Sequence, residues 1–470
     1  MEVITMYKVK TKWSKGNIIT PDGDIGQLTI NKNDIKFHLQ GNGDIFPFNF
    51  VGQGDHKYKV FTNGQQNSDS SGFFYNVSKA FLYNGSDFDD FSGDFIENIQ
   101  SFSFEIPELT EWLKIPSVNL CFENETIIVH ELETPIIILK ETEPKIYIKY
   151  EIKDFLKDMN NYRMELKKIP RIFVEFTDHQ DDSKVFSIIE SIMRFFSLFI
   201  GRISTADDIR LDILNKDTTK IWFFINYDFS IKEKGNAYWT RHRTSFKDIR
   251  EHLQRWFENW YAFTNNSSFK FLQDAFFQIS SKQTWLIEDI FLTYCRFLEG
   301  YDLRISKDEE AANSLEEQLK EVLRDSSISE KLKPMFENVG SKYKYQNVAK
   351  WISNGFLSRI SLDSRIKRLD ERFFGVLATN SKSVIKDTSS TSYYSKIVKT
   401  RNFYSHFKPD SLNTLSINEL YNTLPLMEIL IISILFSEIG VDTDIVKSFL
   451  VHDEVFWPYV THLRTHKQHN

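Results

Sequence analysis

Near the C-terminus, the segment RNFYSH places Arg401 and Asn402 ahead of His406. On an α-helix, residues four apart share a face, whereas a separation of five turns the face by about 140°. We therefore expect the amide of Asn402 to hold the imidazole of His406 in one orientation, while the long side chain of Arg401 reaches the same ligand. Pro409 disfavours helical geometry at Lys408, which places His406 in the last turn of its helix, at an accessible edge.

This trio of side chains suits cleavage of RNA without a metal ion. The 2'-hydroxyl of RNA is a built-in nucleophile, and an imidazole can move its proton or protonate the leaving oxygen near neutral pH. A guanidinium can stabilise the charge that develops on the phosphate. DNA lacks the 2'-hydroxyl and should not be cleaved. The hypothesis requires neither a cofactor nor a metal.

The residues around the motif carry a local excess of positive charge. Between Lys342 and Lys408 there are 14 Lys or Arg against four Asp or Glu, although the whole chain has a net charge of -7. A localised basic segment is what a bound anion would require, although such runs are often only solvated surface. We predict that Lys399, Tyr404 and Lys408 bind RNA beside the catalytic residues.

The spacing of the motif alone is weak evidence, because an arginine and a histidine five residues apart also occur by chance. Arg464 and His469 form a second such pair in the polar tail THLRTHKQHN. Threonine rather than asparagine follows that arginine, and no apolar face surrounds it. We interpret the second pair as a coincidence.

The composition is that of a globular protein in a reducing compartment. Hydrophobic residues make up 41% of the chain and aromatic residues 15%, which is enough for dense cores. Cys121 and Cys295 are the two cysteines, which excludes a disulfide framework or a four-thiolate zinc site and indicates a cytoplasmic location. The N-terminal residues lack the apolar core of a signal peptide. A length of 470 residues predicts two or three domains.

The longest apolar run covers residues 424–436 and is interrupted by Glu428. It is shorter than the roughly 20 residues that span a bilayer, so we interpret it as a buried helix of a bundle. An unpaired carboxylate is costly to bury. We therefore expect Glu428 to have a basic or amide partner.

The first half of the chain has the pattern of strands and turns. Short apolar or alternating runs predict strands over 26–30, 34–40, 57–61, 119–132, 135–140, 145–152 and 171–178, and a hairpin over 208–227. Residues 53–95 are rich in Gly, Asn, Asp and Ser and predict long surface loops. One helix, capped by Asp182 or Ser183, should end at Gly201, and another should start near Thr244.

The polar segment 264–268 is the best linker, because an almost wholly helical pattern follows it. Helices are predicted over 286–298, 306–323, 345–356, 363–377, 390–407, 417–439 and 442–460. The chain should therefore be an α+β protein: a strand-rich domain over residues 1–264 and an all-α helical bundle over residues 269–470.

On the motif RNFYSH within such a bundle, the chain resembles the HEPN ribonuclease superfamily, and most closely its ApeA-like group of abortive-infection proteins. The segment FLTYCRFLEGYDLR, residues 291–304, is similar to an earlier helix of that group. The resemblance implies a sensing or regulatory N-terminal domain, with Arg401, Asn402 and His406 as a metal-free active site for RNA. It also implies a homodimer or higher homo-oligomer and suggests a phage-derived protein trigger.

Other interpretations remain beside this one. A non-catalytic HEPN module that binds RNA or protein would use the same basic residues. Glu299 is better explained as a surface carboxylate than as a partner of Arg401. The triplet RHR at 241–243 is better explained as a solvated loop than as a phosphate grip, and His462, His466 and His469 as a frayed tail rather than a metal site.

Overall fold

The computed structural model describes the chain in segments, and the account below concerns these residues. They are residues 16–19, 25–31, 34–39, 49–53, 57–69, 72–83, 96–113, 120–123, 126–129, 136–140, 143–158, 163–213, 221–225, 242–281, 286–306, 318, 321–322, 325–337, 360–385, 390–406 and 413–463.

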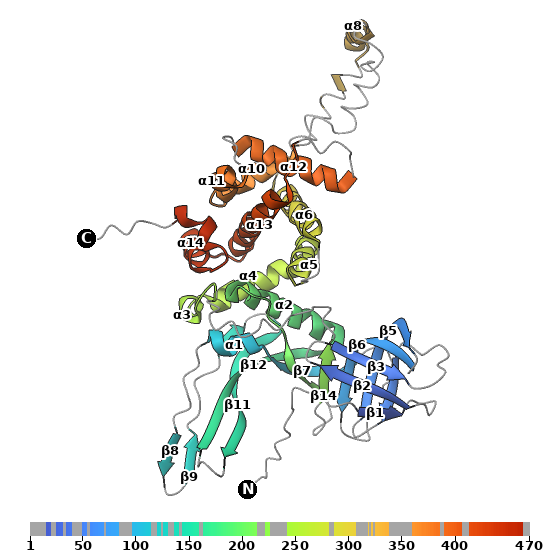
Figure 1. Cartoon of the computed structure of the whole chain (residues 1–470), viewed down its shortest axis with the longest axis vertical. Helices are drawn as coiled ribbons and strands as arrows, with labels where there is room; N and C mark the ends of the chain where they lie inside the picture. The colour runs from blue at the N-terminus through green and yellow to red at the C-terminus, as the bar shows by residue number, and fades with distance from the viewer. Residues whose placement is uncertain are drawn as a thin grey trace, which may run out of the picture.

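Six strands close into a small antiparallel barrel. They are β1 (Gly16–Ile19), β2 (Ile25–Asn31), β3 (Asp34–Leu39), β4 (Asn49–Gln53), β5 (Lys57–Asp69) and β6 (Gly72–Tyr83). Their order is β6-β3-β2-β1-β4-β5, and β5 also pairs with β6, which completes the circle (Figure 1). Phe37, Val60 and Tyr75 are among the side chains that fill its interior, as expected for a narrow barrel. A Cβ at Gly26 would overlap the ring of Phe37, so the close approach requires glycine.

The prediction of long surface loops over residues 53–95 is wrong for most of that segment. Residues 57–69 and 72–83 form the two longest strands of the barrel. In β6, Asn76 and Ser78 alternate with the buried residues Tyr75 and Val77. In β5, the buried residues Val60 and Phe61 are followed by an unbroken polar run over residues 62–69. This polar composition does not prevent pairing, because the two strands are joined by backbone hydrogen bonds.

Beyond β6 the same sheet continues as an open antiparallel layer. Its strands are β14 (Ile221–Ile225), β13 (Asp207–Ile213), β7 (Ile99–Glu105), β12 (Arg163–Gln180), β11 (Lys145–Asp158) and β10 (Ile136–Leu139), in this order. A separate hairpin consists of β8 (Leu120–Glu123) and β9 (Thr126–Val129). One face of the open layer buries Phe102, Ile148 and Ile172 in the main core, together with α1 (Pro107–Trp112) and α2 (Asp182–Ile200).

Helix α2 ends as the sequence predicts but begins with a different cap. Gly201 adopts a left-handed conformation with φ of 82°, which ends the helix. The N-cap is Asp181, whose carboxylate accepts from the amide of Lys184. The predicted cap Asp182 instead accepts from the amide of Ile96 and from Lys79, which ties the helix to the sheet.

The helical part of the chain packs directly on α2. The predicted helix near Thr244 forms two pieces, α3 (Phe246–Ile249) and α4 (Leu253–Asn265). Phe199 of α2 stacks on Trp256 of α4 and meets the rings of Phe436 and Phe449 from the bundle. One buried cluster therefore runs from the sheet into the bundle. Helix α5 (Ser267–Ser281) starts after a break at Asn266, within the predicted linker; the domain boundary itself stays a prediction.

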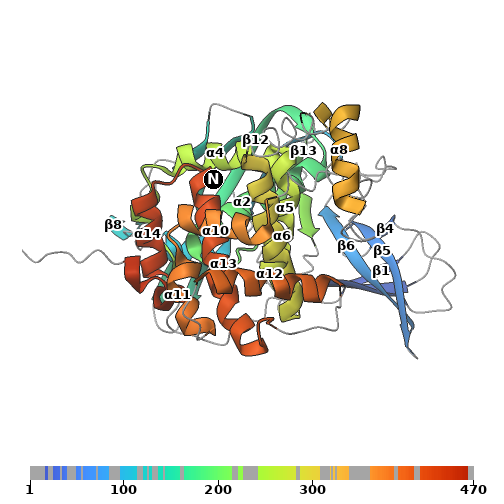
Figure 2. The same cartoon turned by 90° about the horizontal axis from the view of Figure 1, so that it is seen from above.

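The C-terminal part is all helical, so the predicted α+β class is confirmed. Its helices include α6 (Ile287–Ile305), α10 (Leu362–Arg372), α11 (Val376–Ile385), α12 (Ser390–His406), α13 (Ile417–Glu438) and α14 (Thr443–His452), followed by the short turns η2 (Trp457–Tyr459) and η3 (Thr461–Leu463). Helix α13 contacts α6, α11 and α14 and lies inside the bundle, as Figure 2 shows from above. Helix α8 (Ser326–Glu337) stands apart from them in Figure 1.

Helix α13 is long and apolar enough to cross a membrane by length and composition, and among the described residues it alone passes that test. However, 67% of its apolar window is buried inside the protein. This is typical of a core helix in a globular bundle.

Two predicted helices are interrupted, and two others lie almost entirely outside the described residues. The prediction over 363–377 divides at Phe374 and Gly375, which have φ of 74° and 60°. The buried carboxylate of Asp370 then accepts from the amides of Leu377 and Ala378 and caps α11. The prediction over 442–460 divides after His452. The segments 306–323 and 345–356 are the ones that are largely outside the description.

Candidate active site on helix α12

One side of α12 is fixed to α13 by three polar contacts. Thr400 accepts from the amide of Leu415 at 2.7 Å and donates to the carbonyl of Lys396 at 2.8 Å. Lys396 in turn pairs with Glu419, 3.3 Å away. Further along, the buried hydroxyl of Tyr393 donates to Thr423 at 2.9 Å. These contacts tie residues 393–400 of α12 to the first part of α13 and to Leu415 just before it, whereas most of the packing of α12 is against α6, α10 and α11.

The opposite side of α12 faces α6 and carries Arg401. Its guanidinium donates to Glu299 of α6 at 3.2 Å and to the side-chain oxygen of Asn402 at 3.2 Å. The two charged side chains remain 27% and 33% exposed, so this pair is open to solvent. The surface role that the sequence favoured for Glu299 is wrong in this respect, because its carboxylate binds the motif arginine. Cys295 lies buried beneath the pair, and burial raises the pKa of its thiol.

His406 is the last residue of α12 and is exposed. This position agrees with the expectation from Pro409 that the histidine lies at an accessible edge. The expected contact between Asn402 and His406 is absent from the described structure. The amide oxygen of Asn402 faces Arg401 instead, because the guanidinium is the stronger donor nearby. Asn402 thus orients the arginine and not the imidazole.

The residues predicted to bind RNA differ in their accessibility. Lys399 is exposed on α12. Tyr404 is only partly exposed and packs against the main core, and burial together with Glu288 raises the pKa of its hydroxyl. Its ring therefore offers less stacking surface than the sequence suggested. Lys408 lies outside the described residues.

The basic segment presents less free charge than a count along the chain implies. Asp302 of α6 is fully buried and accepts from Arg365 at 3.0 Å and from Arg368 at 2.6 Å. Lys396 and Lys367 also have acidic partners. A local charge count missed Asp302 because this acid lies more than 60 residues before the basic residues that it binds.

The other sites raised by the sequence do not form a second centre. Of the triplet at 241–243, Arg241 lies outside the described residues. Arg243 is buried and pairs with Asp453, so neither the solvated-loop nor the phosphate-grip interpretation holds for this residue. His462 is exposed, whereas His466, His469 and Arg464 lie outside the description. The described part of the chain contains no cluster of three His, Cys, Asp or Glu that could hold a metal.

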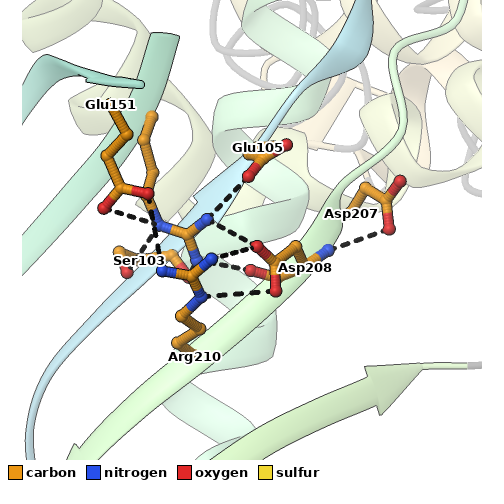
Figure 3. A network of polar contacts seen from close by, with 7 residues as sticks. Ser103, Glu105, Glu151, Asp207, Asp208 and Arg210 are labelled. Atoms are coloured by element: carbon orange, nitrogen blue, oxygen red, sulfur yellow. Dashed lines mark hydrogen bonds and ion pairs between the residues drawn. The ribbon is translucent and has the colours of Figure 1, made fainter. Parts of the chain in front are cut away.

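A second arginine cluster, absent from the sequence predictions, lies in the open sheet. Arg171 of β12 donates to Ser103, Glu105 and Asp208, with its ion pairs to the two acids at 2.8 and 2.9 Å. Figure 3 shows Glu105 of β7, Glu151 of β11, and Asp208 and Arg210 of β13 converging there. Arg171 is 0% exposed, so it has no surface left for a ligand.

Both parts of the chain match models of known protein families. The model for ApeA N-terminal domain 1 matches residues 15–260, and the model for Apea-like HEPN matches residues 292–445. The chain belongs to the ApeA-like HEPN family. The HEPN match includes α6 and α12, and so contains both Glu299 and the motif residues. Searches of curated proteins and of solved structures found no match.

Proposed function

We propose that this HEPN protein is a metal-independent endoribonuclease of anti-phage abortive infection, with its active site at the end of α12. The observation that carries the proposal is the Arg401–Glu299 pair, in which a guanidinium is fixed in place yet remains open to solvent. Arg401 precedes the exposed His406 on α12 by about one and a half helical turns. HEPN domains are generally of the ribonuclease type, which supports the same conclusion.

In the proposed reaction the 2'-oxygen of RNA attacks the adjacent phosphorus. The bond from the 2'-oxygen to phosphorus forms as the bond to the 5'-oxygen breaks, which yields a 2',3'-cyclic phosphate and a 5'-hydroxyl. One proton leaves the nucleophile and another reaches the departing oxygen. His406 moves one of them, and in a homodimer the second copy of His406 moves the other.

Arg401 binds the non-bridging oxygens of the phosphate and stabilises their growing charge. To do so it exchanges part of its contact with Glu299 for the phosphate, while Asn402 keeps the guanidinium oriented. Lys399, and Lys408 beyond the described end of α12, would hold neighbouring phosphates of the RNA. Tyr404 would contact a base at the edge of its partly exposed ring.

The cellular role in this proposal follows from the family to which the chain belongs. We propose that the protein acts in the cytoplasm and that its strand-rich domain restrains the nuclease until a phage-derived protein appears. The family membership supports a role in defence. The barrel and open sheet would then be the sensing part, and the bundle the effector.

The test is cleavage of labelled total RNA in EDTA by the wild type and by His406→Ala. His452→Ala is the matched control, because His452 is also an exposed histidine at the C-terminal end of a helix. We expect the wild type and the control to produce fragments with 2',3'-cyclic phosphate ends, and His406→Ala to produce none.

Equal cleavage by His406→Ala would refute the proposed site. If the wild type is inactive, the assay is repeated in extract from phage-infected cells, which supplies the proposed trigger. Continued inactivity there would favour a non-catalytic HEPN module that binds RNA or protein.

A further inference from the structure

A buried arginine joins the N-terminal domain to the helical bundle. Arg243 is 5% exposed and lies just before α3. Its Nη1 donates to the carbonyl of Leu198 near the end of α2, at 2.6 Å, and its backbone amide donates to Ile200. Its Nε donates to Asp453 of the bundle at 2.7 Å. The side chain is thus fixed on one side to the sensing domain and on the other to the effector domain.

Asp453 forms the turn that ends α14. One of its oxygens accepts from Arg243, and the other accepts from the amides of Val455 and Phe456 at 2.8 and 3.2 Å. The ring of Phe456 covers the guanidinium at 5.0 Å. One oxygen of this carboxylate therefore serves the junction and the other holds its own turn, and a charged hydrogen bond this well enclosed is stronger than one at the surface.

Glu428 is the third member of the cluster. It interrupts the apolar run of α13 and lies within the electrostatic reach of both Arg243 and Asp453, the two charged groups that face it. The expected basic or amide partner is not found as a hydrogen bond or ion pair among the described residues: Arg243 acts on Glu428 through its charge, and its hydrogen bonds go to other acceptors. The residue as a whole is half-buried, but the surrounding protein desolvates the carboxyl, and this raises its pKa to about 7.

Helix α13 links this cluster to the candidate active site. Glu428 lies nine residues after Glu419 and five after Thr423, which hold α12 through Lys396 and Tyr393. Nine residues of helix correspond to about 14 Å. Phe436 of α13 packs on Phe199 of α2 and on Phe449 of α14, so a shift at the junction would reach α13 and, through it, α12. Pro425 interrupts the hydrogen bonding of α13 between these two ends.

From these contacts we propose that Arg243 and Asp453 form an interdomain clasp that restrains the nuclease, with the sensing domain acting on α12 through α13. A charged Glu428 attracts Arg243 and repels Asp453, and both effects work against the contact between Arg243 and Asp453, so the clasp is tightest when Glu428 is neutral. Opening the clasp should accordingly raise activity. The inference rests on the proposed function for its cleavage readout only.

The clasp is tested with two opening variants and one tightening variant of the full chain. Arg243→Gln removes the shared cation, and Asp453→Asn removes the charge while keeping an oxygen for the two amides. Glu428→Gln imitates the neutral acid. Lys145→Gln is the control, because it breaks the exposed pair with Glu175 inside the N-terminal domain. RNA cleavage and hydrogen exchange in residues 390–406 and 417–438 are measured for each.

We expect both opening variants to raise cleavage about ten-fold and to speed hydrogen exchange in α12 and α13. Their double variant should add nothing to either single one, because both break the same clasp. Glu428→Gln should slow both processes at pH 8 and leave them unchanged at pH 6, where the wild-type acid is already neutral. The control should match the wild type.

The proposal fails if the opening variants fold but leave exchange in α12 unchanged, or if their effects simply add. Should Arg243→Gln not fold, Asp453→Asn and Glu428→Gln still decide the question through their opposite signs. If no variant cleaves RNA under any condition, the proposed nuclease activity is wrong. Hydrogen exchange then still shows whether the clasp controls α12.

Discussion

Two arginines of this chain are held by carboxylates in opposite surroundings. Arg171 is sealed in the open sheet, where Ser103, Glu105 and Asp208 accept from its guanidinium. Arg401 has two side-chain acceptors and remains 27% exposed at the rim of the bundle. The sealed guanidinium has no donor to give to a ligand, whereas the open one can exchange a carboxylate for a phosphate. Burial, and not charge, thus separates a structural arginine from a candidate catalytic one.

The sharpest test of this contrast removes each cation in turn. Arg171→Met takes the sealed cation away from Glu105 and from Asp208, of which Asp208 keeps its pair with Arg210, and we expect it to lower the free energy of unfolding by about 3–5 kcal/mol. Arg401→Met should change it by less than about 1 kcal/mol, because its pair is solvated, yet it should abolish cleavage. Thermal unfolding and RNA cleavage measure the two effects. Equal losses of stability would remove the distinction.

Glu428 is an intermediate case, because the charge of Arg243 acts on its carboxyl while the hydrogen bonds of Arg243 go to other groups. Its pKa is raised from 4.5 to about 7, so the folded protein holds a proton that the unfolded chain releases. Its contribution to stability therefore falls as the pH rises from about 4.5 to about 7 and stays low above that. We expect Glu428→Gln to be more stable than the wild type by roughly 2 kcal/mol at pH 8 and equal to it near pH 5. Denaturant unfolding at both pH values measures this difference.

A lack of pH dependence in that difference would mean that Glu428 titrates normally. The same result would take away the charge switch of the clasp, but it would leave the contact between Arg243 and Asp453 in place.

The correct predictions rest on residues that act on their close neighbours in the sequence. Helix α12 was predicted over 390–407 and spans Ser390–His406, because its residues and the proline behind it act on their immediate neighbours. Gly201 ends α2 for the same reason. The wrong predictions concern longer patterns. The strands β5 and β6 resemble loops in composition, yet their backbones pair with each other over most of their length.

The charged partners were largely beyond the reach of sequence patterns. Arg243 and Asp453 are 210 residues apart, Arg401 and Glu299 are 102 apart, and Arg365 and Asp302 are 63 apart. Helical periodicity identifies neighbours three or four positions away, but it does not say which helix packs on which. The motif could therefore be located from the sequence, whereas the carboxylate that positions its arginine could only be listed as one alternative.

Glu299 tests whether the open pair positions Arg401 or merely neutralises it. With Glu299→Gln the guanidinium loses its charged partner but keeps a hydrogen-bond acceptor of the same shape. If Glu299 positions the arginine, we expect kcat for RNA to fall about ten-fold with KM little changed, and stability to change by less than about 1 kcal/mol. An unchanged kcat with a lower KM would show that Glu299 only competes with the phosphate.

Lys399 is expected to give the smallest effect, because it is exposed and one of several cations that can approach the RNA backbone. Lys399→Glu should weaken RNA binding about three-fold at moderate salt. It should also lower the magnitude of the slope of the log binding constant against log salt concentration by about one, as expected for the loss of one phosphate contact. Lys382→Glu, which makes the same charge change at an exposed position of α11, is the control. If both variants weaken binding equally, the effect reflects overall charge and not the end of α12. If only Lys399→Glu weakens RNA binding, the RNA contacts α12 beyond Arg401, along the exposed face of the helix.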